Sequence, residues 1–170
     1  MYGTYETIDG KPAVRFERRY PHPVDRVWRA VTEPGQLAHW FPTTVEVDLR
    51  EGGAMRFTFP GEEMEPMEGA VTLLEPPHRF AFLWGGEELR IELEPDGEGC
   101  RLQFTHLISA RDTAARDAAG WHVCLDGLGS LLSGDAGDAP GTEPTSEWTE
   151  LYEEYQRRGV PAGAPVPGVA

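Results

Sequence analysis

Apolar side chains recur at helical spacing over residues 109–134, the most strongly patterned stretch of the chain. They are spaced three or four residues apart and fall on one stripe of a helix, which consists of Ala114, Ala118, Trp121, Leu125, Leu128 and Leu132. Ser109 and Asp112 have the form of a capping box, and Gly134 suits a left-handed residue at a helix end. The pattern predicts one long amphipathic helix, Ser109–Gly134, with a buried face.

Upstream of this helix the pattern changes to alternation, which is typical of strands with one buried face. The first predicted strand is Ala13–Tyr20, and about six more follow over residues 44–108, separated by turn sequences rich in glycine and proline. Two short helices, Pro23–Thr32 and Gly35–Trp40, are predicted between the first and second strands. We expect an α+β fold in which a curved antiparallel sheet of about seven strands is covered by the long helix.

The two ends of the chain have less apolar bulk. Residues 1–12 are mostly polar and predict a flexible lead-in, whereas residues 159–170 are rich in proline and glycine and predict a disordered tail. A last helix, Ser146–Arg158, is predicted to pack back through one face, made of Trp148, Leu151, Tyr152 and Tyr155. One domain over residues 13–158 is therefore expected.

Composition narrows the classes of partner. The net charge is −14, which disfavours nucleic acid and anionic membrane surfaces because both repel an acidic protein. No run of eighteen apolar residues and no secretory signal pattern is present, so we expect a cytoplasmic protein that does not enter a membrane. The two cysteines, Cys100 and Cys124, fit no disulfide framework and are expected to be reduced.

The order of strand, two short helices, antiparallel sheet and long helix is that of the helix-grip fold. The sequence resembles the START-related SRPBCC superfamily, in particular homologues of the activator of the heat-shock protein 90 ATPase. The resemblance covers residues 13–134 and is carried by RRYPHPVDRVWRAVTEPGQLAHWF (18–41), VDLREGGAMRF (47–57), EGAVTLLEPPHRFAFLW (68–84), LQFTH (102–106) and GWHVCLDGLGSLL (120–132). It implies a cavity between sheet and helix that holds a hydrophobic or amphipathic small molecule, and it supplies no catalytic motif.

Candidate cavity residues come from both layers of this arrangement. The sheet and its connections contribute Trp40, Phe57, Phe59, Met67, Phe82, Trp84, Phe104 and His106, and the helix contributes Asp117, Trp121, Leu125 and Leu128. Two interpretations stay open, because the same side chains either line a void or fill a core. His106 either binds a ligand or is a core histidine bonded to a backbone carbonyl. Asp117 either lies at a pocket mouth or is simply favourable near a helix N-terminus.

Other chemistries find no support in the residue spacing. His122 and Cys124 are two residues apart on the predicted helix and diverge by about 200°, so they do not share a metal ion. No GxSxG nucleophile turn is present, and the glycine pairs at 52–53 and 85–86 have the context of hairpin turns. No metal, cofactor or catalytic residue is therefore predicted.

Three functions remain as hypotheses. The first is a small-molecule-binding protein without chemistry of its own. The second is a cyclase- or aromatase-like enzyme, in which an acid or base such as His106 or Asp117 guides proton transfer. The third is a chaperone partner, which is disfavoured because only about a dozen residues precede the first predicted strand, where the activator carries a further domain. The resemblance leaves a homodimer open.

Overall fold

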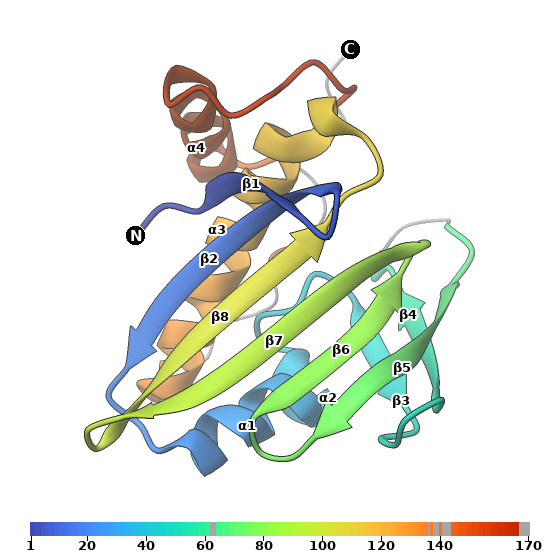
Figure 1. The fold of residues 1–170 in the computed structure, drawn as a ribbon, viewed down its shortest axis with the longest axis vertical. Coiled ribbons are helices and arrows are strands. Elements are labelled where there is room, and N and C mark those ends of the chain that lie inside the picture. The colour runs from blue at the N-terminus through green and yellow to red at the C-terminus, as the bar shows by residue number, and fades with distance from the viewer. Residues whose placement is uncertain (62–63, 136, 138–139, 141–143, 167–170) are drawn as a thin grey trace.

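One curved antiparallel sheet and one long helix form the body of the protein (Figure 1). The structure is a computed structural model that describes residues 1–61, 64–135, 137, 140 and 144–166. The eight strands lie in the order β1-β2-β8-β7-β6-β5-β4-β3. Their bounds are β1 Thr4–Ile8, β2 Lys11–Tyr20, β3 Thr44–Val47, β4 Ala54–Thr58, β5 Met67–Glu75, β6 Arg79–Trp84, β7 Glu87–Asp96 and β8 Gly99–Leu107. The predicted α+β helix-grip architecture is confirmed.

The helices also follow the predicted order. They are α1 Val24–Thr32, α2 Pro34–Leu37, α3 Ala114–Leu132 and α4 Ser146–Arg157, with a 3-10 turn, η1, at Arg111–Thr113. Helix α1 contacts β7, β8 and α3, and the indole Nε1 of Trp40 donates to the Ala30 carbonyl at 2.9 Å. This bond fixes the end of α2 against α1, so the next residues, Phe41 and Pro42, are held beside α3.

Helix α3 begins five residues later than predicted. The expected capping box does not form, because Ser109 N, from which the Asp112 side chain would accept, donates to Glu87 instead. The Asp112 carbonyl accepts from Ala164 N at 3.2 Å. Residues 111–113 instead form the 3-10 turn, and no side chain caps α3. Tertiary partners at this end replace the local capping bonds.

The C-terminal end of α3 is as predicted. Gly134 has φ +87°, a conformation that strains residues with a side chain. Its N–H donates to Leu131 O at 3.1 Å, and Asp135 N donates to Ser130 O at 2.9 Å. This pair of bonds is a Schellman motif and satisfies two of the last carbonyls of the helix.

The lead-in predicted over residues 1–12 contains a strand. Thr4–Ile8 pairs with the start of β2, with Ile8 opposite Lys11. The two-residue turn is Asp9-Gly10, with φ of +52° and +76°, a sequence that favours tight hairpins. The sheet therefore has eight strands rather than about seven, and the hairpin is made by turn chemistry rather than by an apolar face.

The predicted tail is packed along α3 as far as Val166. Ala115 N donates to Pro161 O at 2.9 Å, Val160 N donates to Tyr155 O at 3.0 Å, and Ala164 is 8% exposed. Residues 159–166 are held by these backbone hydrogen bonds and by packing of Val160 and Ala162 on the core, and a count of apolar side chains does not anticipate the backbone bonds. Residues 167–170 of the predicted tail lie outside the described residues.

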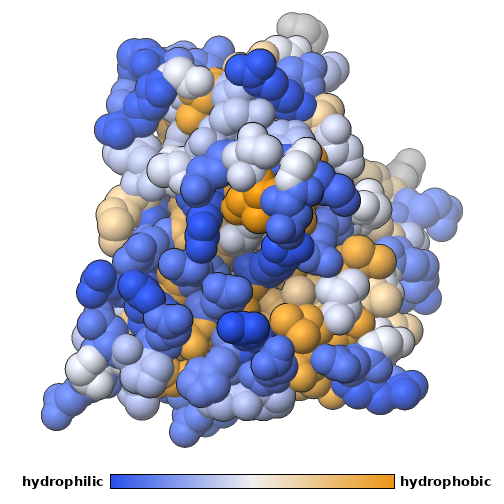
Figure 2. All heavy atoms as spheres, in the orientation of Figure 1, coloured by the Kyte–Doolittle hydropathy of each residue, from blue (hydrophilic) through white to orange (hydrophobic). Residues whose placement is uncertain are grey.

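The outer face of the sheet is largely hydrophilic (Figure 2). Its side chains pair across strands, as in the 2.8 Å bond from Arg15 to Gln103 and the 2.9 Å ion pair of Arg19 with Asp96. The apolar faces of the strands are therefore turned toward α3, where any internal site must lie. Among the described residues, no helix is long and apolar enough to cross a membrane.

Candidate functional site

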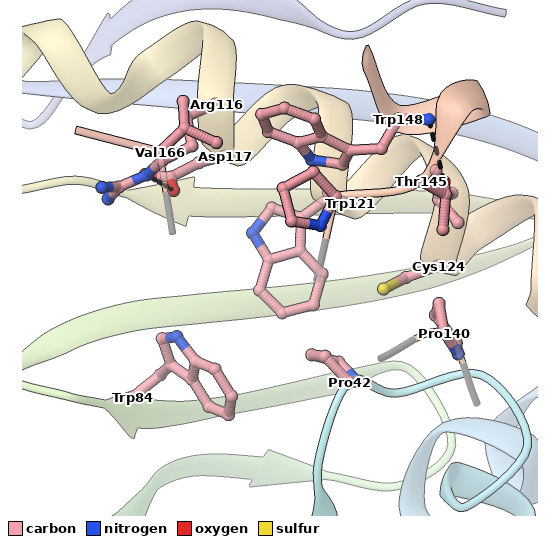
Figure 3. A pocket seen from close by; sticks show the side chains of 13 residues that line it. Pro42, Trp84, Arg116, Asp117, Trp121, Cys124, Pro140, Thr145, Trp148 and Val166 are labelled. Atoms are coloured by element: carbon pink, nitrogen blue, oxygen red, sulfur yellow. Dashed lines mark hydrogen bonds and ion pairs between the residues drawn. The ribbon is translucent and has the colours of Figure 1, made fainter. Parts of the chain in front are cut away.

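An apolar pocket of about 210 Å³ lies where α3, α4, the end of β6 and the C-terminal segment meet (Figure 3). Three indoles from three different elements line it: Trp84 from β6, Trp121 from α3 and Trp148 from α4. We call it the tryptophan pocket. Its other lining residues are Pro42, Arg116, Asp117, Gly120, Val123, Cys124, Pro140, Pro144, Thr145 and Val166.

The wall made by α4 is fixed by local bonds at its first turn. Thr145 is the N-cap residue, and its Oγ1 accepts a hydrogen bond from Trp148 N at 3.1 Å. The Trp148 ring stacks on Tyr152 with 5.0 Å between centroids and 11° between planes. Cap and stack together set the position of the Trp148 indole.

Space for the pocket comes from small residues on α3. A Cβ atom placed on Gly120 would lie 3.8 Å from Trp148 Nε1, so the helix backbone approaches the indole with no side chain between them. The neighbouring Cys124 is 3% exposed, and burial raises the pKa of its thiol, which stays protonated. The α3 wall is consequently small and uncharged at its centre.

One ion pair stands in the lining. Arg116 Nε lies 3.3 Å from Asp117 Oδ1, and Arg116 Nη1 donates to the Pro165 carbonyl at 3.1 Å. The two charges balance each other, and the arginine also ties the C-terminal segment to α3. This pair supplies the charged groups of an otherwise apolar surface.

Of the twelve predicted cavity residues, Trp84, Asp117 and Trp121 line this pocket. The remaining nine lie elsewhere in the fold: Trp40, Phe57, Phe59, Met67, Phe82, Phe104, His106, Leu125 and Leu128. Phe59 and Met67 are half-buried, and the other seven are buried. Phe59 contacts Trp84 at 6.3 Å between centroids.

Rings occupy the region between α3 and the middle of the sheet. Phe41, which carried no prediction, is fully buried and lies 5.6 Å from Trp121, 6.1 Å from Phe57 and 6.1 Å from Phe82, measured between centroids. Phe104 lies 4.8 Å from Trp121. These contacts favour the core-filling interpretation for this group of residues.

His106 is held between two side chains instead of a backbone carbonyl. The Trp121 indole Nε1 donates to His106 Nδ1 at 3.0 Å, so the ring proton is assigned to Nε2, which donates to Glu87 Oε1 at 2.9 Å. His106 thus acts on the pocket indirectly, by orienting the Trp121 indole.

Glu87 completes this chain of bonds and also receives Ser109 N. Burial by itself raises the pKa of Glu87, but the hydrogen bonds from His106 and Ser109 outweigh it and hold this pKa below its ordinary value. The carboxylate is therefore ionised at neutral pH.

A second polar chain joins α3 to α4 away from the pocket. Gly3 N donates to Tyr155 Oη at 2.8 Å, and Tyr155 Oη lies 2.8 Å from His122 Nδ1. His122 Nε2 lies 3.6 Å from Asp126. Within the described part of the chain, no cluster of three or more histidine, cysteine or acidic side chains has the geometry of a metal site.

The sequence analysis missed the part of the pocket beyond residue 133. Trp148 comes from the predicted last helix and Val166 from the predicted tail, whereas Pro140, Pro144 and Thr145 come from residues 135–145, for which the sequence predicts no helix or strand. One signal was available, because Trp148 shares its predicted helix face with three other apolar residues. The spacing of apolar residues in a helix does not predict that this face lines a pocket opposite α3.

Comparisons with known proteins agree with this fold. Residues 21–133 match the family described as Activator of Hsp90 ATPase homolog 1-like protein. Among solved structures, CalU16 from Micromonospora echinospora is 28% identical, with 92% of each chain covered and a TM-score of 0.70. No curated protein matches.

Two further structures show how far the similarity extends. DynU16, described by its place in the dynemicin biosynthetic locus, is 27% identical over 75% of this chain and 51% of its own, with a TM-score of 0.63. The Aha1 dimer from Colwellia psychrerythraea is 21% identical over 74% of this chain and 98% of its own, with a TM-score of 0.62, a likeness that shows the fold alone. Because the family match spans most of the chain, this protein belongs to the Activator of Hsp90 ATPase homolog 1-like family.

Proposed function

We propose that this protein binds a small hydrophobic or amphipathic molecule in the tryptophan pocket. The observation that carries the proposal is the convergence of three indoles on one apolar space with a single balanced ion pair in its lining. Ligand sites are typically concave, apolar and aromatic, with few polar groups. Supporting this, DynU16, a structural neighbour, comes from a biosynthetic locus.

No observation favours a catalytic role over binding. An acid or base that acts on a bound molecule must reach it, and His106 is not among the lining residues, while Asp117 is paired with Arg116. A cytoplasmic location stays a prediction from the sequence, and the resemblance leaves a homodimer open.

A pocket-filling variant tests the proposal. In Gly120→Leu the added side chain extends from α3 toward Trp148 and occupies the pocket, and Gly120 has no positive φ that would strain the substitution. Glu153→Leu adds the same side chain on the exposed face of α4 and is the matched control. Both variants are purified alongside the wild type and examined by native mass spectrometry.

We expect a co-purifying small molecule with the wild type and with Glu153→Leu, and its loss from Gly120→Leu. Circular dichroism checks that both variants are folded. The proposal would be contradicted if no small molecule co-purifies with the wild type and if an added aromatic probe, 2-acetylnaphthalene, binds the wild type and Gly120→Leu equally well.

A further inference from the structure

The volume of the tryptophan pocket limits the size of its ligand. Dry protein cavities of about 150 Å³ accept one benzene ring. At about 210 Å³ this pocket has room for one or two fused rings, with larger substituents directed out of the mouth. Because the pocket is open on one side, its volume bounds the part of a ligand that is buried between the walls.

The walls favour an aromatic ligand. Trp84 and Trp121 lie 6.0 Å apart between centroids at 65°, and Trp148 lies across from them (Figure 3). One face of Trp148 is already covered by Tyr152. Flat rings meet such walls by stacking and by edge-to-face contacts, which add to simple burial of apolar area.

The charges in the lining disfavour an ionised ligand. Arg116 and Asp117 already pair with each other. A cationic ligand would have to compete with Arg116 for the carboxylate, and an anionic ligand would have to compete with Asp117 for the guanidinium. An anion is also repelled by the net charge of −14. Separating the pair to bind an ion would leave the other charge without its partner.

Two indole N–H groups in the lining are available to a ligand. Trp121 Nε1 donates its hydrogen bond to His106. Among the described residues, Trp84 Nε1 and Trp148 Nε1 donate to no protein atom. Thr145 Oγ1 accepts from Trp148 N, so its hydroxyl is used as an acceptor by the N-cap. A ligand oxygen in the pocket can accept a hydrogen bond from either indole.

We propose that the ligand of the tryptophan pocket is an uncharged aromatic compound of one or two fused rings that carries a hydrogen-bond-accepting oxygen. This rests on the proposed function, since it names the ligand class of the same site. A ketone or ether oxygen receives the N–H of Trp84 or Trp148, and the ring lies between the indoles.

Four probes with one ring system test the ligand class by equilibrium dialysis. The ketone 2-acetylnaphthalene carries an acceptor oxygen, and the hydrocarbon 2-ethylnaphthalene has neither an oxygen nor a charge. The other two probes are charged: 2-naphthoate is an anion and 2-naphthylmethylammonium is a cation. We expect the ketone to bind about 3- to 10-fold more tightly than the hydrocarbon, the range of one neutral hydrogen bond. Both ions should bind more weakly than the ketone.

Indole-to-phenyl variants test the donors. Trp84→Phe and Trp148→Phe keep a ring and remove the N–H, so at least one should lose the preference for the ketone while still binding the hydrocarbon. Trp28→Phe makes the same change on α1, where Trp28 contacts Phe80, and should keep the preference.

The outcomes distinguish a failure of this inference from a failure of the proposed function. Equal binding of ketone and hydrocarbon, or tightest binding of an ion, overturns the ligand class and leaves the pocket as a binding site. A native ligand that is lost in Gly120→Leu, together with no binding of any probe, also overturns the ligand class alone. Absence of both a native ligand and probe binding overturns the two proposals together.

Discussion

The two sides of α3 show how one helix can close a core on one face and leave a pocket on another. Toward the sheet, Leu125 and Leu128 are buried and Phe41 meets Trp121 beneath the helix. Toward α4 and the C-terminal segment, Gly120 and Cys124 present little bulk to Trp148. Large side chains on both partners fill the first contact, whereas small residues opposite an indole leave space in the second.

The largest expected effect comes from removing a ring from the packed core between α3 and the sheet. Phe41→Ala removes a fully buried ring that contacts five others, and we expect a loss of about 3 to 5 kcal/mol of unfolding free energy. Urea unfolding measures it. Leu83→Ala on the outer face of β6, where Leu83 is 37% exposed, is the control and should change little. A loss below about 1 kcal/mol in Phe41→Ala would mean that the rings do not fill this space.

The next effect concerns the bonds that orient Trp121 between the two sides. Glu87→Gln leaves a single acceptor oxygen for His106 and Ser109, and we expect a loss of about 1 to 2 kcal/mol at pH 7. Because folding lowers the pKa of Glu87, its contribution is present above the ordinary carboxyl range and disappears as pH falls through the lowered value.

The difference between wild type and Glu87→Gln should therefore shrink in acid, as measured by urea unfolding at several pH values. Glu92→Gln, on the exposed side of β7, is the matched control and should show no such pH dependence. A difference that stays constant from pH 7 to acid would contradict the role of the carboxylate.

A smaller effect is expected on the pocket side. Thr145→Ala removes the N-cap bond of α4 and should cost about 1 kcal/mol. Since the cap also positions Trp148, binding of 2-acetylnaphthalene should weaken in the same variant. Thr145→Ser keeps a capping oxygen and should restore both properties. Unchanged binding in Thr145→Ala would contradict the claim that the N-cap bond positions Trp148 in the pocket wall.

The smallest expected effect is the pH response of the α3–α4 contact. Burial lowers the pKa of His122, with a further contribution from Arg18, against the opposing attraction of Asp126. The unfolded state therefore takes up a proton first, and stability should fall as pH drops from above the ordinary histidine value of about 6.5 through the lowered one. Thermal unfolding of wild type and His122→Gln between pH 7.5 and 5.5 tests this, because the variant should lose part of the slope.

Periodicity was sufficient for the architecture and insufficient for the site. The spacing from Ala114 to Leu132 and the alternation in the strands indicate which side chains face inward, and these faces are as predicted. Whether the inward-facing rings contact one another depends on three-dimensional packing. Here the contact is made by Phe41, which lies outside every predicted element and packs against Phe57, Phe82 and Trp121. The Asp9-Gly10 turn was a readable hairpin signal, whereas the backbone bonds of residues 159–166 leave no trace in side-chain pattern.

The most direct test of a ligand site beside α3, rather than beneath it, is a crystal structure of the protein with 2-acetylnaphthalene. We predict the naphthalene ring among Trp84, Trp121 and Trp148, with its carbonyl oxygen within hydrogen-bond distance of Trp84 Nε1 or Trp148 Nε1. A ring found instead among Phe57, Phe82 and Phe104, with Phe41 displaced, would contradict the account.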